Sequence, residues 1–273
     1  MLIVLPPSET KAFGGDGAPL NWDSLSELSF PHLHEVRREI ARDLAALPIE
    51  HAFAVLGVSE KLRPELEANQ DLATAATMPA IFRYTGVLYD ALDAHNLPAA
   101  ALDSLAVGSA LFGVVGARDP IPYYRLSGGT KLPVRGDAGA GTEANARDAA
   151  HATNAATSAP TMKKRWGSAI TQALKETNEL IVDLRSGTYQ QLGRVPAVTV
   201  RVETIHDDGT RKVVSHFNKH YKGELARELS LAAAQGARPE TAEEVAAIAR
   251  AAGMTVEGPV DKQKCRELTL VVS

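Results

Sequence analysis

Leu105 to Leu132, LAVGSALFGVVGARDPIPYYRLSGGTKL, joins an apolar segment to a loop suited to binding. The first half is rich in small residues and far shorter than a bilayer span, which predicts a buried strand or core segment. Asp119, Pro120 and Pro122 then prevent a helix or a central strand from continuing. The tyrosines, cations and glycine pair that follow lie on a loop fixed by proline, and loops on a rigid core commonly present binding groups. A rim loop whose tyrosines only pack is the alternative.

The chain has 273 residues, one cysteine and a formal net charge of −4. This length buries a core without disulfides or a structural metal. No apolar run reaches spanning length, and Met1–Leu5 leads into two prolines rather than a signal peptide, so we expect a cytoplasmic protein without membrane contact. The mildly acidic balance leaves room for nucleic-acid binding only at a local basic patch.

Apolar periodicity predicts strands alternating with helices early in the chain and a hairpin late in it. Strands are expected at 1–5, 179–184, 197–205, 211–217 and 268–272. Helices are expected at 31–47, 60–68, 162–178, 219–235 and 241–252. In the first helix, charged residues such as Arg37 and Asp43 are expected on the polar faces. The pattern predicts one mixed α/β domain over residues 1–273, with a mostly buried mixed sheet flanked by helices.

Residues 136–161 contain almost only Gly, Ala, Thr, Asn, Ser and a few charges. Such a composition cannot bury enough apolar surface to offset the entropy of ordering it. We therefore expect a flexible, low-complexity surface insertion that need not mark a domain boundary.

The segment from Val55 to Leu62 approximates a helix-hairpin-helix element, in which a turn glycine separates two helices. In that motif the backbone N–H groups of the turn, here Gly57 to Ser59, face a phosphate. Ser59 acting only as the N-cap of the following helix is the alternative.

Three other candidate chemistries have simpler explanations. His206, Asp207, Asp208, His216 and His220 are residue types that bind iron or zinc, but a hairpin turn explains the aspartates, and we expect no metal or cofactor. Cys265 lies among cations that lower a thiol pKa, yet a half-buried cysteine beside the last strand accounts for it. Ser8 and Ser186 follow apolar strands, although neither has the Gly-x-Ser-x-Gly surroundings of a nucleophile elbow. Whether the protein is an enzyme stays open.

Cations are concentrated in two places. One is 211–227, which holds Arg211, Lys212, Lys219, Lys222 and Arg227, and the other is the run of three at 163–165. A solvated surface is the alternative to a binding surface.

Six short motifs, in order along the chain, resemble those of the YaaA-type peroxide-stress resistance proteins. They are Pro7 with Thr10; Gly86, Tyr89 and Leu92; Ser109–Val114 continuing to Tyr124–Leu126, Gly129 and Leu132; Trp166–Gly167; Leu184, Ser186 and Tyr189; and Lys219, Lys222–Gly223 and Arg227. The chain departs from the family pattern at Gly116–Ala117, at Thr85 and at Glu9, where one common form has lysine. The resemblance covers most of the chain apart from 136–161. It implies a cytoplasmic protein of the hydrogen peroxide response that limits damage from reactive iron and binds DNA through a positive cleft with a helix-hairpin-helix element.

Three hypotheses follow. In the first, the protein binds DNA without sequence preference, with cations on phosphates, aromatic side chains that stack or pack, and the 57–59 turn on a further phosphate. The cations are Lys11, Arg118, Arg125, Lys131, Lys219, Lys222 and Arg227, and the aromatic residues are Tyr124, Trp166 and Tyr189. In the second, an enzyme acts on a small anionic or nucleotide-like substrate in the same cleft, with Arg125, Ser186 and Tyr189 at its polar core. In the third, the histidines and aspartates of 206–220 handle iron.

Overall fold

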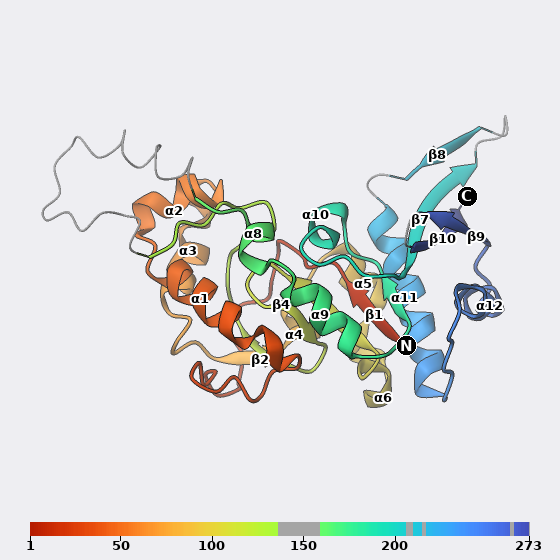
Figure 1. Ribbon diagram of the computed structural model, residues 1–273, viewed down its shortest axis with the longest axis horizontal. Helices are drawn as coiled ribbons and strands as arrows, with labels where there is room; N and C mark the ends of the chain where they lie inside the picture. Colours follow the sequence, from red (N-terminus) through yellow and green to blue (C-terminus); the bar gives the residue numbers. More distant parts are fainter. Residues whose placement is uncertain (136–158, 206–209, 215–216, 263–264, 273) are drawn as a thin grey trace, which may run out of the picture.

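The computed structural model describes residues 1–135, 159–205, 210–214, 217–262 and 265–272, and a mixed sheet of eight strands runs through them (Figure 1). Its strand order is β4-β3-β1-β6-β7-β10-β9, with β8 paired to β7. The strands are β1 (Leu2–Leu5), β3 (Leu105–Ser109), β4 (Gly113–Gly116), β6 (Ile181–Asp183), β7 (Val198–Ile205), β8 (Arg211–Val213), β9 (Val256–Lys262) and β10 (Cys265–Val272). A separate two-stranded sheet pairs β2 (Thr77–Pro79) with β5 (Pro120–Pro122).

Helices of very different lengths flank the sheet, as the sequence predicts (Figure 1). The α-helices are α1 (His34–Ala45), α2 (Ile49–Leu56), α3 (Arg63–Gln70), α4 (Ala80–Arg83), α5 (Val87–Leu92), α6 (Ala99–Leu102), α8 (Met162–Trp166), α9 (Ala169–Glu176), α10 (Gly187–Gln190), α11 (Asn218–Ala234) and α12 (Ala242–Ala251). The short 3-10 helices among the described residues are η1 (Pro31–Leu33), η2 (Glu60–Leu62) and η3 (Ala94–Asn96). The mixed α/β fold class is thereby confirmed. Within the described ranges, no helix combines the length and apolarity that crossing a membrane requires.

Five neighbouring strands, β3, β1, β6, β7 and β10, run parallel to one another. Strand β1 is buried along its whole length, and its Ile3 pairs with Leu105 of β3 on one side and Val182 of β6 on the other. Central parallel strands are covered on both faces, which explains their continuous apolar runs. The chain's first strand therefore lies in the middle of the sheet.

The apolar run that opens the central stretch forms a hairpin of β3 and β4 rather than one strand. Gly113 opens β4 with a φ of +74°, and the Ser109 Oγ accepts a hydrogen bond from the Phe112 N–H at 2.9 Å. The prolines that were expected to exclude a central strand, Pro120 and Pro122, lie in β5 of the small sheet.

Two charged residues of α1 are not on a solvated face, which corrects the prediction for them. Arg37 is fully buried and donates to the carbonyl oxygens of Phe112 (2.9 Å), Val114 (2.6 Å) and Ser29 (2.9 Å). Asp43 is buried in an ion pair with Arg165. Both side chains satisfy polar groups of distant segments, which helical periodicity cannot reveal.

Other boundaries differ from expectation. The helix predicted over 162–178 is broken into α8 and α9 because Gly167 takes a φ of +51°. Strand β9 has no predicted counterpart. Between α2 and α3, Gly57 has a φ of +65° and Ser59 takes the N-cap position of η2 without a side-chain cap bond. Two helices joined by a turn are thus present. That they act as a phosphate-binding helix-hairpin-helix element stays a prediction. Residues 136–158 of the expected insertion lie outside the described residues, as do His206, Asp207, Asp208 and His216 of the considered metal set.

Candidate functional site

The carboxyl ends of β3, β1 and β6 lie side by side, because these strands are adjacent and parallel. The chain leaves β1 toward β3 and leaves β6 toward β7, so the two connections diverge at this edge. In open α/β sheets, ligands bind in the crevice outside such a divergence. Here the loops that leave this edge are 6–11, which follow β1, and 184–189, which follow β6, and we call the region between them the crevice.

Lys11 ends the first of these loops and is only 9% exposed. Its Nζ donates to the Ser8 carbonyl oxygen at 3.1 Å and lies 4.6 Å from the ring centre of Tyr124 and 5.4 Å from that of Tyr84. Burial, and after it the positive charge of Arg125, lowers the pKa of Lys11 to about 7. The amine is therefore divided between its charged and neutral forms at neutral pH.

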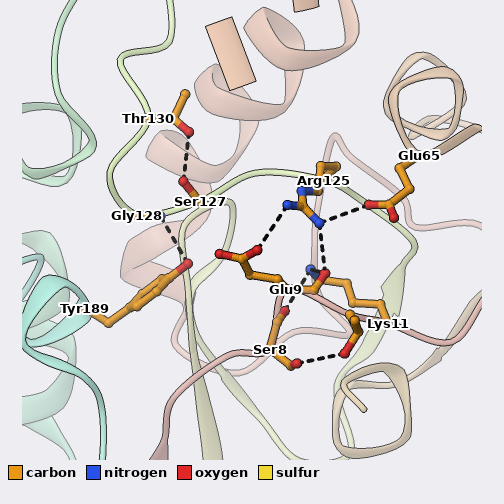
Figure 2. A network of polar contacts seen from close by, with 10 residues as sticks. Ser8, Glu9, Lys11, Glu65, Arg125, Ser127, Gly128, Thr130 and Tyr189 are labelled. Carbon is orange, nitrogen blue, oxygen red and sulfur yellow. Dashed lines mark hydrogen bonds and ion pairs between the residues drawn. The ribbon is translucent and has the colours of Figure 1, made fainter. Parts of the chain in front are cut away.

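A chain of hydroxyl groups lies beneath Lys11. The Tyr124 hydroxyl is 2.7 Å from the Tyr84 hydroxyl and 2.7 Å from the Ser109 Oγ, and all three residues are buried. Burial raises the pKa values of Tyr84 and Tyr124, so both phenols stay neutral over the physiological range. The loop of the central stretch thus packs its second tyrosine beneath the site, while Arg125 points toward the crevice (Figure 2).

Arg125 is bound by two carboxylates from different parts of the chain (Figure 2). Its Nη2 lies 3.2 Å from Glu9 Oε2, and its Nη1 lies 3.2 Å from Glu65 Oε2 of α3. The Asn69 side chain holds the Arg125 backbone, accepting from its N–H at 2.7 Å and donating to its carbonyl oxygen at 3.0 Å. The local charge of this arginine is largely balanced within the protein.

Tyr189 enters the crevice from α10, and its hydroxyl accepts a hydrogen bond from the Gly128 N–H at 3.1 Å. Burial raises the pKa of Tyr189. Ser186 is exposed at the N-cap of the same short helix. The Leu-x-Ser-x-x-Tyr motif therefore ties the loop after β6 to the glycine pair of the central stretch.

A cavity of about 330 Å³ opens beside the loop after β1. Ser8, Glu9 and Thr10 line one wall, Gly86 and Lys219 the others. The Ser8 and Thr10 hydroxyl oxygens are 3.1 Å apart. Lys219 thus lies across the cavity from the loop whose Glu9 binds Arg125. The Tyr124–Arg125 loop and the start of α11 are therefore both next to residues 8–10.

Several cations of the predicted site point elsewhere. Lys222 is directed at the Leu184 carbonyl oxygen (3.4 Å), and burial lowers its pKa. Arg227 donates to the Leu92 and Asp93 carbonyl oxygens at 2.9 and 3.0 Å. Arg118 pairs with Asp103, which precedes β3, so Arg118 lies at the opposite edge of the sheet. The charged groups of these three residues already bind oxygen atoms of the protein.

The remaining predicted residues also separate into two groups. Trp166 is buried and donates its indole N–H to the Ala110 carbonyl oxygen at 2.9 Å, so its ring is not free to stack on a base. Lys131 is exposed and follows the Gly128–Gly129 pair, whereas Gly57 and Ser59 are exposed on the turn between α2 and α3.

Where the structure is described, no group of three or more candidate metal ligands comes together. Cys265 is half-buried at the start of β10, with its Sγ 3.7 Å from the Val195 carbonyl oxygen.

Sequence reasoning missed Glu65, Asn69, Tyr84 and Ser109 as parts of this site. Glu65 and Asn69 lie four residues apart on α3, a spacing that places them on one face, but nothing local marks them as partners of residue 125. Tyr84 and Ser109 are buried polar residues within otherwise apolar segments. A polar residue in such a segment needs a hydrogen-bond partner, and this feature of the sequence could have marked both as parts of a polar site.

Comparison with known proteins gives a consistent picture. The sequence model of a family described as "Peroxide stress protein YaaA" matches residues 1–142 and 149–252. A UPF0246 protein of Corynebacterium glutamicum is 57% identical over 274 residues, covering all of both chains, and one of Corynebacterium efficiens is 59% identical over 273 residues, again covering both. A UPF0246 protein of Streptomyces coelicolor is 40% identical over all of this chain and 98% of its own length. The chain belongs to the YaaA family of peroxide stress proteins.

Proposed function

We propose that this protein acts in the cytoplasmic response to hydrogen peroxide by binding DNA beside the crevice and limiting iron-driven damage there. Family membership supports the stress role. The observation that carries the DNA contact is a set of exposed lysines without a carboxylate within salt-bridge distance among the described residues. Four members of this set are Lys131, Lys163, Lys164 and Lys219.

These lysines belong to two regions of the molecule. Lys131 follows the glycine pair that Tyr189 contacts, and it bridges to Thr161, the N-cap of the helix that carries Lys163 and Lys164. Lys219 lines the cavity beside the loop after β1. Unpaired ammonium groups can contact phosphates without first breaking an ion pair within the protein. Such contacts to the phosphate backbone suit sequence-independent binding.

A DNA titration at 50 and 200 mM salt tests this proposal. Four phosphate contacts predict roughly a hundredfold loss of affinity between the two conditions. Lys131→Glu and Lys219→Glu should each weaken binding, whereas Lys175→Glu, in the last turn of α9, should not. Strand breaks in plasmid DNA exposed to ferrous iron and peroxide then measure protection. Absence of binding at low salt, or equal weakening by Lys175→Glu, would overturn the DNA contact.

A second candidate is an enzyme that acts on a small anionic or nucleotide-like substrate in the same crevice. The specific observation in its favour is Lys11, whose pKa of about 7 lets the buried amine accept a proton at neutral pH. The cavity of about 330 Å³ has the size of a small-ligand pocket rather than of a duplex groove. Chromatography of a nucleotide mixture incubated with the wild type and with Lys11→Met tests it: conversion by neither protein rejects the enzyme.

A further inference from the structure

The two carboxylates that bind Arg125 are buried to very different extents. The Glu65 side chain is 16% exposed and the Arg125 side chain 15%, but the Glu9 side chain is 77% exposed. An exposed ion pair contributes little free energy, so the contact between Glu9 and Arg125 breaks easily. Glu65 is the fixed partner, and Glu9 is the replaceable one.

Arg125 keeps its place when Glu9 moves, because its backbone is fixed independently of its side chain. The Asn69 amide binds both the N–H and the carbonyl oxygen of residue 125, and Asn69 itself is buried. The backbone that carries the guanidinium group is therefore preorganised. Exchanging the exposed partner of Arg125 then needs little further ordering of this residue.

Other polar groups surround the position of the Glu9 carboxylate. It lies between Arg125 and the Tyr189 hydroxyl in Figure 2, and its charge contributes to the raised pKa of Tyr189. The Glu9 carbonyl oxygen accepts weakly from both Arg125 Nη1 (3.4 Å) and Lys11 Nζ (3.5 Å), so the two cations are neighbours. Arg125, which follows β5, donates to the Glu9 carboxylate, while Lys11 donates to the carbonyl oxygen of the same residue and the Tyr189 hydroxyl lies on the other side of the carboxylate in Figure 2.

We propose that the Glu9 carboxylate occupies the place of a ligand's phosphate group, and that a phosphate of a nucleotide or nucleic acid displaces it to bind Arg125 beside Lys11 and the Tyr189 hydroxyl. Guanidinium groups bind carboxylates and phosphates with the same two-pronged geometry, so one can replace the other. This inference rests on the proposed function and names the anionic subsite of its crevice.

Displacement is coupled to protonation of Lys11. The charged groups that act on Lys11 are Arg125 and Arg83, which lower its pKa, and Glu65 and Glu9, which raise it; the Tyr84 and Tyr124 rings beside it are neutral. A phosphate dianion in place of the single Glu9 charge raises the Lys11 pKa further. At pH 8 the free protein holds mostly neutral Lys11, so binding takes up a proton from solution.

Calorimetric titration at pH 8 in two buffers of different ionisation enthalpy tests the inference, with three probes. Inorganic phosphate and adenosine 5′-monophosphate carry the dianion, and an unphosphorylated oligothymidylate carries only diesters. We expect net proton uptake for the dianions in the wild type and none in Lys11→Met. A preference for the oligothymidylate would assign the subsite to a nucleic-acid backbone, and a preference for the monophosphate to a free nucleotide or strand end.

Two variants test the displacement itself. Glu9→Gln removes the competing charge and should tighten phosphate binding about fivefold, whereas Arg125→Gln should weaken it about tenfold or more. The matched control is Glu67→Gln, an exposed residue of α3 without an ion pair among the described residues, which should leave affinity unchanged.

Unchanged phosphate affinity in Glu9→Gln, or binding without proton uptake in the wild type, would overturn the inference. If DNA still binds then and Lys219→Glu weakens it, the proposed function stands alone. If phosphate binding responds to Glu9→Gln while DNA does not bind, the subsite stands and the DNA role falls.

Discussion

Two buried cations, Arg37 and Lys11, show how a single residue's surroundings set its charge. Burial lowers both pKa values, that of Arg37 to about 10 and that of Lys11 to about 7. Arg37 spreads its charge over three carbonyl oxygens, while Lys11 has one carbonyl at 3.1 Å and two aromatic rings. Arg37 therefore stays charged as a structural donor, and Lys11 becomes the group that titrates near neutrality.

Lys11 makes stability depend on pH. Its folded-state pKa of about 7 lies below the ordinary value of 10.5, so the unfolded chain binds more protons between these values. The free energy of unfolding then rises with pH across this window. Below pH 7 the buried amine is charged, and the protein bears the full free-energy cost of burying that charge. Chemical denaturation should show the wild type gaining about 3 kcal/mol relative to Lys11→Met between pH 7 and 9.5. A constant difference between the two proteins would contradict this.

Helices α11 and α5 approach each other closely at Gly223. A Cβ at this position would lie 2.3 Å from the Leu88 carbonyl oxygen and 2.8 Å from the Ala91 Cβ. The Lys222–Gly223 motif thus has a packing reason besides any charge. This contact positions Lys219, one turn earlier on the same helix, beside the cavity.

Gly223→Ala should destabilise the protein by about 2 kcal/mol, although alanine favours helices over glycine by about 1 kcal/mol. The backbone oxygen of Leu88 cannot rotate away as a side chain would, so α11 must shift. Urea denaturation measures the change. Gly187→Ala in α10, with open space around the added methyl group, is the matched control and should change stability by less than about 0.5 kcal/mol.

At the scale of the whole molecule, segments far apart in the chain are interleaved. Strand β1 lies between β3 and β6. Helix α5 packs on α11 (Figure 1). The amino terminus also binds Glu179 at 2.6 Å. The eight-stranded sheet therefore takes strands from both halves of the described chain.

Unfolding should accordingly be a single cooperative transition. Calorimetric and van't Hoff enthalpies should agree, and circular dichroism should follow tryptophan fluorescence, to which Trp166, buried beside Gly113 of β4, contributes. Two resolved transitions would show that the parts before and after the 136–158 segment unfold separately, against a single domain.

Local sequence determined several of the long elements. The apolar run of β1, the α11 boundaries and the capping box of Thr241 and Glu244 in α12 follow from residues close in the chain. Periodicity works for these because burial and capping depend on neighbours within a few residues. It failed at Arg37, whose hydrogen-bond partners lie far away in the chain, and at Gly167, whose positive φ interrupts an otherwise helical pattern.

Only the tertiary structure decided which predicted cations are available. Arg125 meets Glu65 and Glu9, which are 60 and 116 residues away, and Arg227 is held by Asp93. Charge interactions depend on distance through space and on burial, and neither is encoded in spacing along the chain. The amino-acid order thus gave the family and the framework, while folding left Lys131 and Lys219 open to solvent and made Lys11 a titrating group.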